Sequence, residues 1–127
     1  MKNQKKYISA ALFALSICFY AFTQHPGINN IAAKMRAGDA AGVAAYFDGN
    51  IEMSILGKDA YNKATATTAI KTFFGANQPS GFTIKHEGTA PNGSQYVIGN
   101  LTTSSGDYRA YIVVNGDTIQ ELTIENW

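Results

Sequence analysis

The chain has 127 residues, with 10 basic and 9 acidic side chains and a formal net charge of +1. This balance lacks the basic excess of a nucleic-acid-binding surface, and the length suits a single domain with one core. The only cysteine, Cys18, lies near the N-terminus, so the rest of the chain contains no disulfide, thiolate nucleophile or cysteine zinc site.

The first 23 residues have the composition of a secretory signal peptide. Three lysines precede an almost uncharged apolar stretch, which ends in Ala21-Phe22-Thr23 with small residues at alternating positions. We expect cleavage after Thr23 and export to the periplasm or the outside of the cell, leaving residues 24–127 as one domain. The alternative is retention of the segment as a membrane anchor, but its apolar run of about 16 residues is shorter than the roughly 20 that a spanning helix needs.

Two helices are expected first in this domain. Apolar residues at helical spacing predict a helix over residues 29–37, and Gly38 supplies its end. Asp39 is a good N-cap for a second, short helix that includes Val43 and Phe47.

A strand and a third helix follow. Ile51, Met53 and Ile55 alternate with polar residues, which predicts a strand with one buried face, and a break is expected at residues 57–59. Asn62 is the expected N-cap of a helix over residues 63–74 that ends at Gly75.

The last third of the chain has the pattern of an antiparallel meander. Its strand-like runs cover residues 82–89, 94–104, 108–114 and 118–126, separated by Asn92-Gly93, Ser105-Gly106 and Asn115-Gly116. Asn-Gly favours the positive φ of tight hairpin turns. The order of elements therefore predicts an α+β fold with the helices on one face of a mostly antiparallel sheet.

Short sequence motifs along the chain support a resemblance to a known family. They are Gly38-Asp39-Ala40, Tyr46-Phe47-Asp48, Tyr61 with Lys63-Ala64, Phe73-Phe74, Phe82 with Lys85-His86, Tyr96 with Ile98-Gly99, Leu101-Thr102-Thr103, Tyr108-Arg109 with Tyr111, and Ile119 through Glu125. As a set they resemble the secreted Bacteroidetes domain of unknown function numbered 4783, in the nuclear transport factor-two-like (cystatin-like cone) superfamily. The resemblance implies helices that close over a curved sheet and leave a pocket, and it implies no particular chemistry.

The hairpin register predicts which side chains share the pocket. With two-residue loops at Asn92-Gly93 and Ser105-Gly106, residue 86 pairs with residues 99 and 112, and residue 84 pairs with 101 and 110. The predicted pocket-lining residues are Phe82, Ile84, His86, Leu101, Tyr108 and Ile112. His86 is then the candidate catalytic base, since a histidine suits proton transfer near neutral pH. The alternative is a half-buried histidine that is satisfied by a backbone carbonyl.

The last turn decides where the acidic residues lie. A two-residue loop at Asn115-Gly116 would turn Glu121 toward the core, whereas a three-residue loop through Asp117 would pair 110 with 122 and bury Leu122 and Ile124. We prefer the longer loop, because burying a large aliphatic side chain is worth about 1.5 to 3 kcal/mol. A bulge near Ile119 would have the same effect.

In that register a group of polar and aromatic residues shares the outer face of the sheet. These candidate interface residues are Tyr96, Arg109, Tyr111, Glu121 and Glu125. Tyrosine and arginine are enriched at interface hot spots, so the group predicts a partner or dimer surface. The alternative is an exposed cross-strand ion pair worth about 1 kcal/mol or less.

No motif in the sequence calls for a metal or a cofactor, and none is expected. The only histidines are His25 and His86, and there is no phosphate loop, dinucleotide fingerprint or nucleophile elbow. The first hypothesis is a non-catalytic domain that binds a small apolar ligand or a protein partner. The alternatives are a lyase or isomerase with His86 as base and Tyr61 or Tyr108 as hydrogen-bond donor, and a dimeric structural module of the cell envelope.

Overall fold

The computed structural model of the protein describes residues 26–127, and the expected signal peptide lies outside the described residues. The elements in chain order are α2 (Pro26–Ala37), α3 (Ala40–Ala44), β1 (Phe47–Ile55), β2 (Lys58–Ala60), α4 (Lys63–Ala76), β3 (Pro79–Thr89), β4 (Gln95–Thr103), β5 (Gly106–Asn115) and β6 (Thr118–Glu125).

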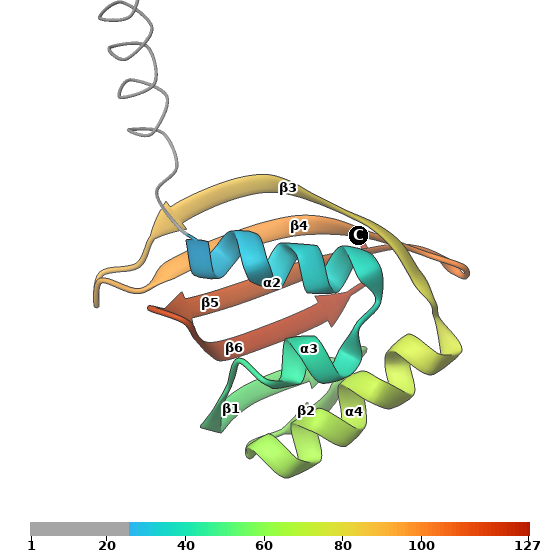
Figure 1. Cartoon of the computed structure of the whole chain (residues 1–127), viewed down its shortest axis with the longest axis horizontal. Coiled ribbons are helices and arrows are strands. Elements are labelled where there is room, and N and C mark those ends of the chain that lie inside the picture. Colours follow the sequence, from blue (N-terminus) through green and yellow to red (C-terminus); the bar gives the residue numbers. More distant parts are fainter. Residues whose placement is uncertain (1–25) are drawn as a thin grey trace, which may run out of the picture.

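The strands form one curved, six-stranded sheet in the order β2-β1-β6-β5-β4-β3, and the helices cover one of its faces (Figure 1). The meander from β3 to β6 and the α+β class are as predicted. Two features of the sheet were not predicted. The short edge strand β2 replaces the expected break, and β1 pairs with β6 in parallel. That parallel pairing joins the N-terminal half of the domain to the end of the meander.

The helix boundaries follow from local chemistry at the caps. Gly38, with φ of 67°, follows α2, and the Asp39 side chain accepts a hydrogen bond of 2.8 Å from the Gly42 amide at the start of α3. The Asn62 side chain caps α4 in the same way, accepting from the Thr65 amide at 2.9 Å. These predicted caps are confirmed. The predicted end at Gly75 is wrong, because α4 runs to Ala76, and Phe47 begins β1 instead of lying in the second helix.

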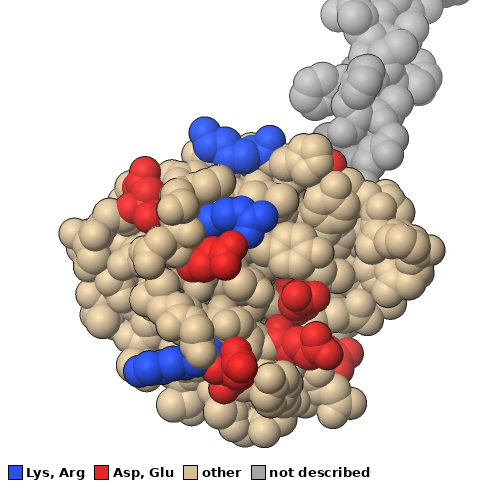
Figure 2. All heavy atoms as spheres, turned by 180° about the vertical axis from the view of Figure 1, so that it is seen from behind, with Lys and Arg blue, Asp and Glu red and all other residues tan. Residues whose placement is uncertain are grey.

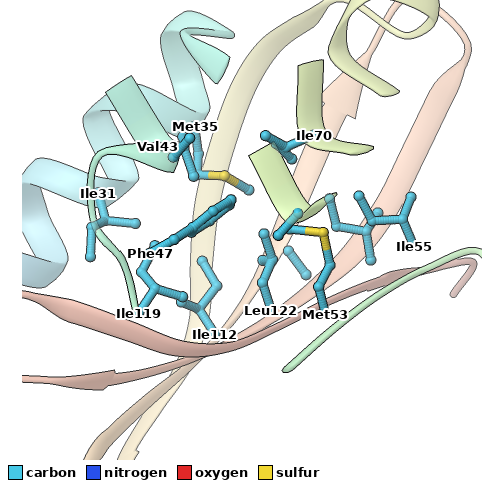
Figure 3. Close-up of a cluster of buried hydrophobic side chains, with 14 of the residues drawn as sticks. Ile31, Met35, Val43, Phe47, Met53, Ile55, Ile70, Ile112, Ile119 and Leu122 are labelled. Atoms are coloured by element: carbon cyan, nitrogen blue, oxygen red, sulfur yellow. The ribbon is translucent and has the colours of Figure 1, made fainter. Parts of the chain in front are cut away.

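The core lies between the helices and the inner face of the sheet. Figure 3 shows Met35, Val43 and Ile70 from the three helices pointing toward Phe47 and Leu122 of the sheet. Of these residues, Phe47 is the most exposed, at 4%. The space between α2 and the sheet is only about 10 Å³, which is room for one water molecule at most.

The apolar residues predicted to line a pocket are therefore core residues. Phe82, Leu101 and Ile112 are buried, while Ile84 and Tyr108 are half-buried and pack against the core. The prediction of the inner face itself was correct, because β4 and β5 pair as Gly99 with Ala110. The loop is Ser104-Ser105, so the predicted pairing shifts by two residues and every side chain keeps its face.

His86 is the exception, and its predicted place in a pocket is wrong. Ile84 pairs with Gly99 but His86 pairs with Ile98, so Lys85 is an extra residue in β3. A bulge of one residue reverses the alternation beyond it. The first hairpin loop also spans residues 90–94 instead of Asn92-Gly93. His86 is consequently exposed, on the face of the sheet that points away from the helices.

The last hairpin combines a short loop with a second bulge. Asn115 pairs with Thr118 around the two-residue loop Gly116-Asp117, so the preferred three-residue loop is wrong. A register shift next to Ile119 then restores the pattern, and Ala110 pairs with Ile124. Leu122 and Ile124 are 0% and 1% exposed. The alternative of a bulge near Ile119 is thus confirmed, together with the outward orientation of the acidic residues.

Candidate functional site on the outer face of the sheet

The outer face is the side of the sheet that the helices leave uncovered. It includes Thr83, His86 and Gly88 of β3, Tyr96, Ile98, Asn100 and Thr102 of β4, Asp107, Arg109, Tyr111 and Val113 of β5, Glu121, Thr123 and Glu125 of β6, and Glu52 and Ser54 of β1. All five predicted interface residues belong to it. His86, predicted inside, joins them.

Three rings form a row across β3, β4 and β5. The centroids of His86 and Tyr96 are 5.8 Å apart, and those of Tyr96 and Tyr111 are 6.2 Å apart. His86 Nε2 and the Tyr96 hydroxyl are within hydrogen-bond distance at 3.2 Å. The Tyr96 ring lies over Gly88, where a Cβ atom would overlap it. The row is therefore held in place by a close fit to the backbone and by the hydroxyl contact.

The predicted cross-strand ion pair is present beside this row. Arg109 Nη1 donates to Glu125 Oε1 at 2.6 Å, with the two side chains 29% and 49% exposed. Nearby, Trp127 Nε1 donates to Asn100 Oδ1 at 2.7 Å, so the last residue of the chain lies on β4. Of the two predicted acidic partners, Arg109 therefore pairs with Glu125 and not with Glu121. An ion pair this exposed adds little to the stability of the fold.

The opposite side of the outer face is acidic. Glu52 and Glu121 are directly paired in the parallel register of β1 and β6, and neither forms an ion pair within residues 26–127. Partial burial, and secondarily the charge of Glu52, raise the pKa of Glu121 above its ordinary value of 4.5. Glu52 and Glu121 line two surface hollows, of about 160 and 360 Å³. Figure 2 shows one group of acidic side chains at the lower right of the view, and others spread singly over the same face.

Tyr61 belongs to the edge of this acidic region and not to a pocket. It is 66% exposed, and its hydroxyl donates to Asp59 Oδ2 at 3.3 Å. The charge of Asp59 raises the pKa of the Tyr61 hydroxyl. The lyase hypothesis required Tyr61 or Tyr108 beside His86. Instead, Tyr61 is over β2, Tyr108 lies at the core, and His86 contacts Tyr96.

Sequence reasoning missed Glu52 because nothing local indicates that β1 joins β6. The alternation around Glu52 correctly predicts that it points outward, and the pairing with Glu121 follows only from the fold. Within residues 26–127 no cluster of three or more His, Cys, Asp or Glu side chains could hold a metal ion. None of the helices in this part of the chain is long and apolar enough to cross a membrane.

Helices packed on one face of a curved, mostly antiparallel sheet give this domain the nuclear transport factor-two-like, cystatin-like fold. The family model described as "Domain of unknown function (DUF4783)" matches residues 28–125, and the chain belongs to this family. A crystal structure of a DUF4783 family protein from Bacteroides ovatus is 25% identical, with a TM-score of 0.69, over 77% of this chain and 93% of that chain.

More distant structures share the fold alone. An NTF-2 like protein of unknown function from Burkholderia xenovorans is 10% identical, with a TM-score of 0.59, over 80% of this chain and 81% of that one. A putative polyketide cyclase from Sinorhizobium meliloti is 9% identical, with a TM-score of 0.62, over 80% of this chain and 95% of that one. No curated protein matches the chain.

Proposed function

We propose that this domain is a non-catalytic binding module that associates with a second copy of itself through the outer face of the sheet. The observation that supports this most directly is the row of His86, Tyr96 and Tyr111 on a face that no helix covers. Tyrosine supplies a large, rigid contact area together with a polar group, which is why it recurs at interface hot spots.

The charges of this surface favour a second copy as the partner. Arg109 of β5 is the basic residue of this face, whereas Glu52 and Glu121 lie farther along the sheet, on β1 and β6. A two-fold axis through the sheet face would place the basic side of each copy against the acidic side of the other. The partner's cations would then relieve the repulsion between Glu52 and Glu121.

The lyase or isomerase hypothesis finds no support in the geometry. A general base must share a site with its substrate, and His86 lies outside the cone with Tyr96 as its hydrogen-bond partner. The polyketide cyclase is only 9% identical to this chain, so the likeness extends to the fold and not to the activity.

The site of action is part of the proposal. We propose export after removal of residues 1–23, on the strength of the basic, apolar and small-residue pattern at the N-terminus. The mature N-terminus of protein recovered from the cell envelope or the medium tests this. Protein found only in the cytosol, with Met1 or Lys2 at its N-terminus, would contradict it.

A charge-swap experiment tests self-association. Sedimentation velocity across a wide concentration range should give a concentration-dependent dimer, which Glu121→Lys weakens because it places like charges opposite one another. Arg109→Glu should weaken it similarly, and the double variant Arg109→Glu with Glu121→Lys should recover much of the loss. Lys71→Glu, at an exposed position of α4 away from this face, is the matched control and should have no effect.

Two outcomes would overturn the proposal. A monomer at every concentration would refute association with a second copy, and a dimer that is insensitive to both charge reversals would assign the interface to another surface.

A further inference from the structure

A second surface, separate from the outer face, has the form of a small-molecule site. It is a groove of about 320 Å³ between the second half of α4 and the β1–β2 hairpin, on the helix side of the sheet. Its lining includes Leu56 and Lys58 from the hairpin and Ala69, Phe73, Ala76 and Asn77 from α4 and its C-terminal cap. A volume of this size is at the lower end of those that bind small ligands.

The hairpin loop at the lip of the groove has an unfavourable residue. Ile55 pairs with Lys58 around Leu56-Gly57, with φ of 49° and 83°, so both loop residues have positive φ. Glycine and asparagine adopt this conformation readily, whereas leucine adopts it at a cost. Leu56 is also 46% exposed, so its side chain gains only part of the stabilisation that burial would give. Strained residues of this kind concentrate at ligand sites.

The floor of the groove is rigid and apolar. Phe73 is 6% exposed and packs edge-to-face against Tyr108, with ring centroids 5.2 Å apart. The Tyr108 hydroxyl donates to Asn77 Oδ1 at 3.4 Å, which ties the end of α4 to β5. The Leu56 amide donates to the Ile124 carbonyl at 2.9 Å and holds the opposite wall on β6. Ala69 and Ala76 are too small to fill the space between these walls.

The charge of the groove defines one end of its ligand. Lys58 is the one charged residue in the lining, and it forms no ion pair within residues 26–127. Its neighbour Asp59 lines the hollow on the outer face, because successive strand residues point to opposite sides. The groove therefore offers an apolar trough with a single cation at its edge.

We propose that this groove binds a small free carboxylic acid with an apolar body, of the size of a medium-chain fatty acid. The apolar body lies along Leu56, Ala69 and Ala76 over Phe73, and the carboxylate meets the Lys58 ammonium. The Leu56 side chain covers the ligand and gains the burial that the unliganded fold does not give it. This inference does not depend on self-association, because the two surfaces share no residue.

Octanoate is the probe, and octylamine, with the same chain and the opposite charge, is its control. In amide NMR spectra of the purified protein, octanoate should produce saturable shifts centred on Leu56, Lys58 and Phe73. Octylamine should bind at least about tenfold more weakly, since it brings a cation to Lys58. Equal binding of the two probes, or octanoate shifts confined to other residues, would overturn the proposal.

Two variants test the roles of the lip residues. Leu56→Asn suits the positive φ, so the fold should be at least as stable, yet octanoate affinity should fall about tenfold because an apolar contact is lost. Lys58→Gln should weaken octanoate severalfold while leaving octylamine no weaker, and Lys71→Gln, elsewhere on the protein surface, should change neither. Unchanged octanoate affinity in both Leu56→Asn and Lys58→Gln would refute the site. Light scattering on the same samples reports self-association separately.

Discussion

Glu121→Gln should stabilise the domain at neutral pH, although it removes a charge from the surface. Glu121 lies directly opposite Glu52 in the parallel pairing of β1 and β6, and no cation within residues 26–127 pairs with either. Opposite charges directly across two strands contribute about 0.2 to 1 kcal/mol, and like charges there are destabilising, which we take to be of the same order. We expect a gain in the free energy of unfolding of about 0.5 kcal/mol, or roughly 2 to 4 °C in the midpoint of thermal unfolding of a domain this size.

The pH dependence of this gain has a definite sign. Burial and Glu52 raise the pKa of Glu121 in the folded state above its ordinary value of 4.5, so ionising it costs more in the folded chain than in the unfolded chain. The wild-type protein therefore loses stability as the pH rises from the ordinary value through the raised one. The advantage of Glu121→Gln should be full at neutral pH and should vanish below pH 4.5, where both states bind the proton.

Urea denaturation at low protein concentration, repeated from pH 3.5 to pH 8, measures the effect without a contribution from association. Glu125→Gln is the matched control, because the same substitution on the same strand removes an ion pair with Arg109. It should lower stability by up to about 1 kcal/mol. In a Glu52→Gln background the gain from Glu121→Gln should shrink. A loss of stability in Glu121→Gln at neutral pH, or a gain that does not change with pH, would refute the reasoning.

Substitutions at three further positions test two close contacts and one helix cap. Gly99→Ala should cost about 1 to 3 kcal/mol in urea denaturation, because its Cβ would overlap the buried ring of Phe82, and a neutral result would show that the ring moves aside freely. Asn62→Ala should cost about 1 kcal/mol through loss of the α4 cap, whereas Asn62→Ser should be nearly neutral by the same assay. Gly88→Ala should displace the Tyr96 ring and alter the NMR signals of His86, with unchanged signals contradicting the fit of ring to backbone.

Local chemistry was sufficient to predict much of the fold. Asp39 and Asn62 are residue types that cap helices by accepting a hydrogen bond from the amide three residues later. Both side chains make this bond in the structure. The alternation of Ile51, Met53 and Ile55 correctly placed these residues in the core. These predictions needed only neighbouring residues, because caps and strand faces are determined within a few positions of the chain.

Pairings between distant segments were not predictable in this way. The parallel alignment of β1 with β6 brings Glu52 to Glu121, and it follows from how the helices and the meander pack as a whole. The groove beside Leu56 likewise needs the placement of α4 against the β1–β2 hairpin. The apolar pattern predicts whether each of these residues points toward the core or toward solvent. The side chains that it contacts come from distant parts of the chain, so the pattern does not predict them.

The two bulges show why the apolar pattern revealed one register change and not the other. In β6 a simple two-residue turn would have exposed Leu122 and Ile124, so the sequence itself indicated that an extra residue was needed. In β3 the residues after Ile84 are Lys85, His86 and Glu87, and no large apolar side chain there prefers one face. Exchanging the two faces of this segment would change the buried apolar area very little, so the hydrophobic pattern alone does not determine its register. The bulge moves His86 out of the cone and into contact with Tyr96, which removes the basis for a catalytic pocket and completes the aromatic row of the outer face.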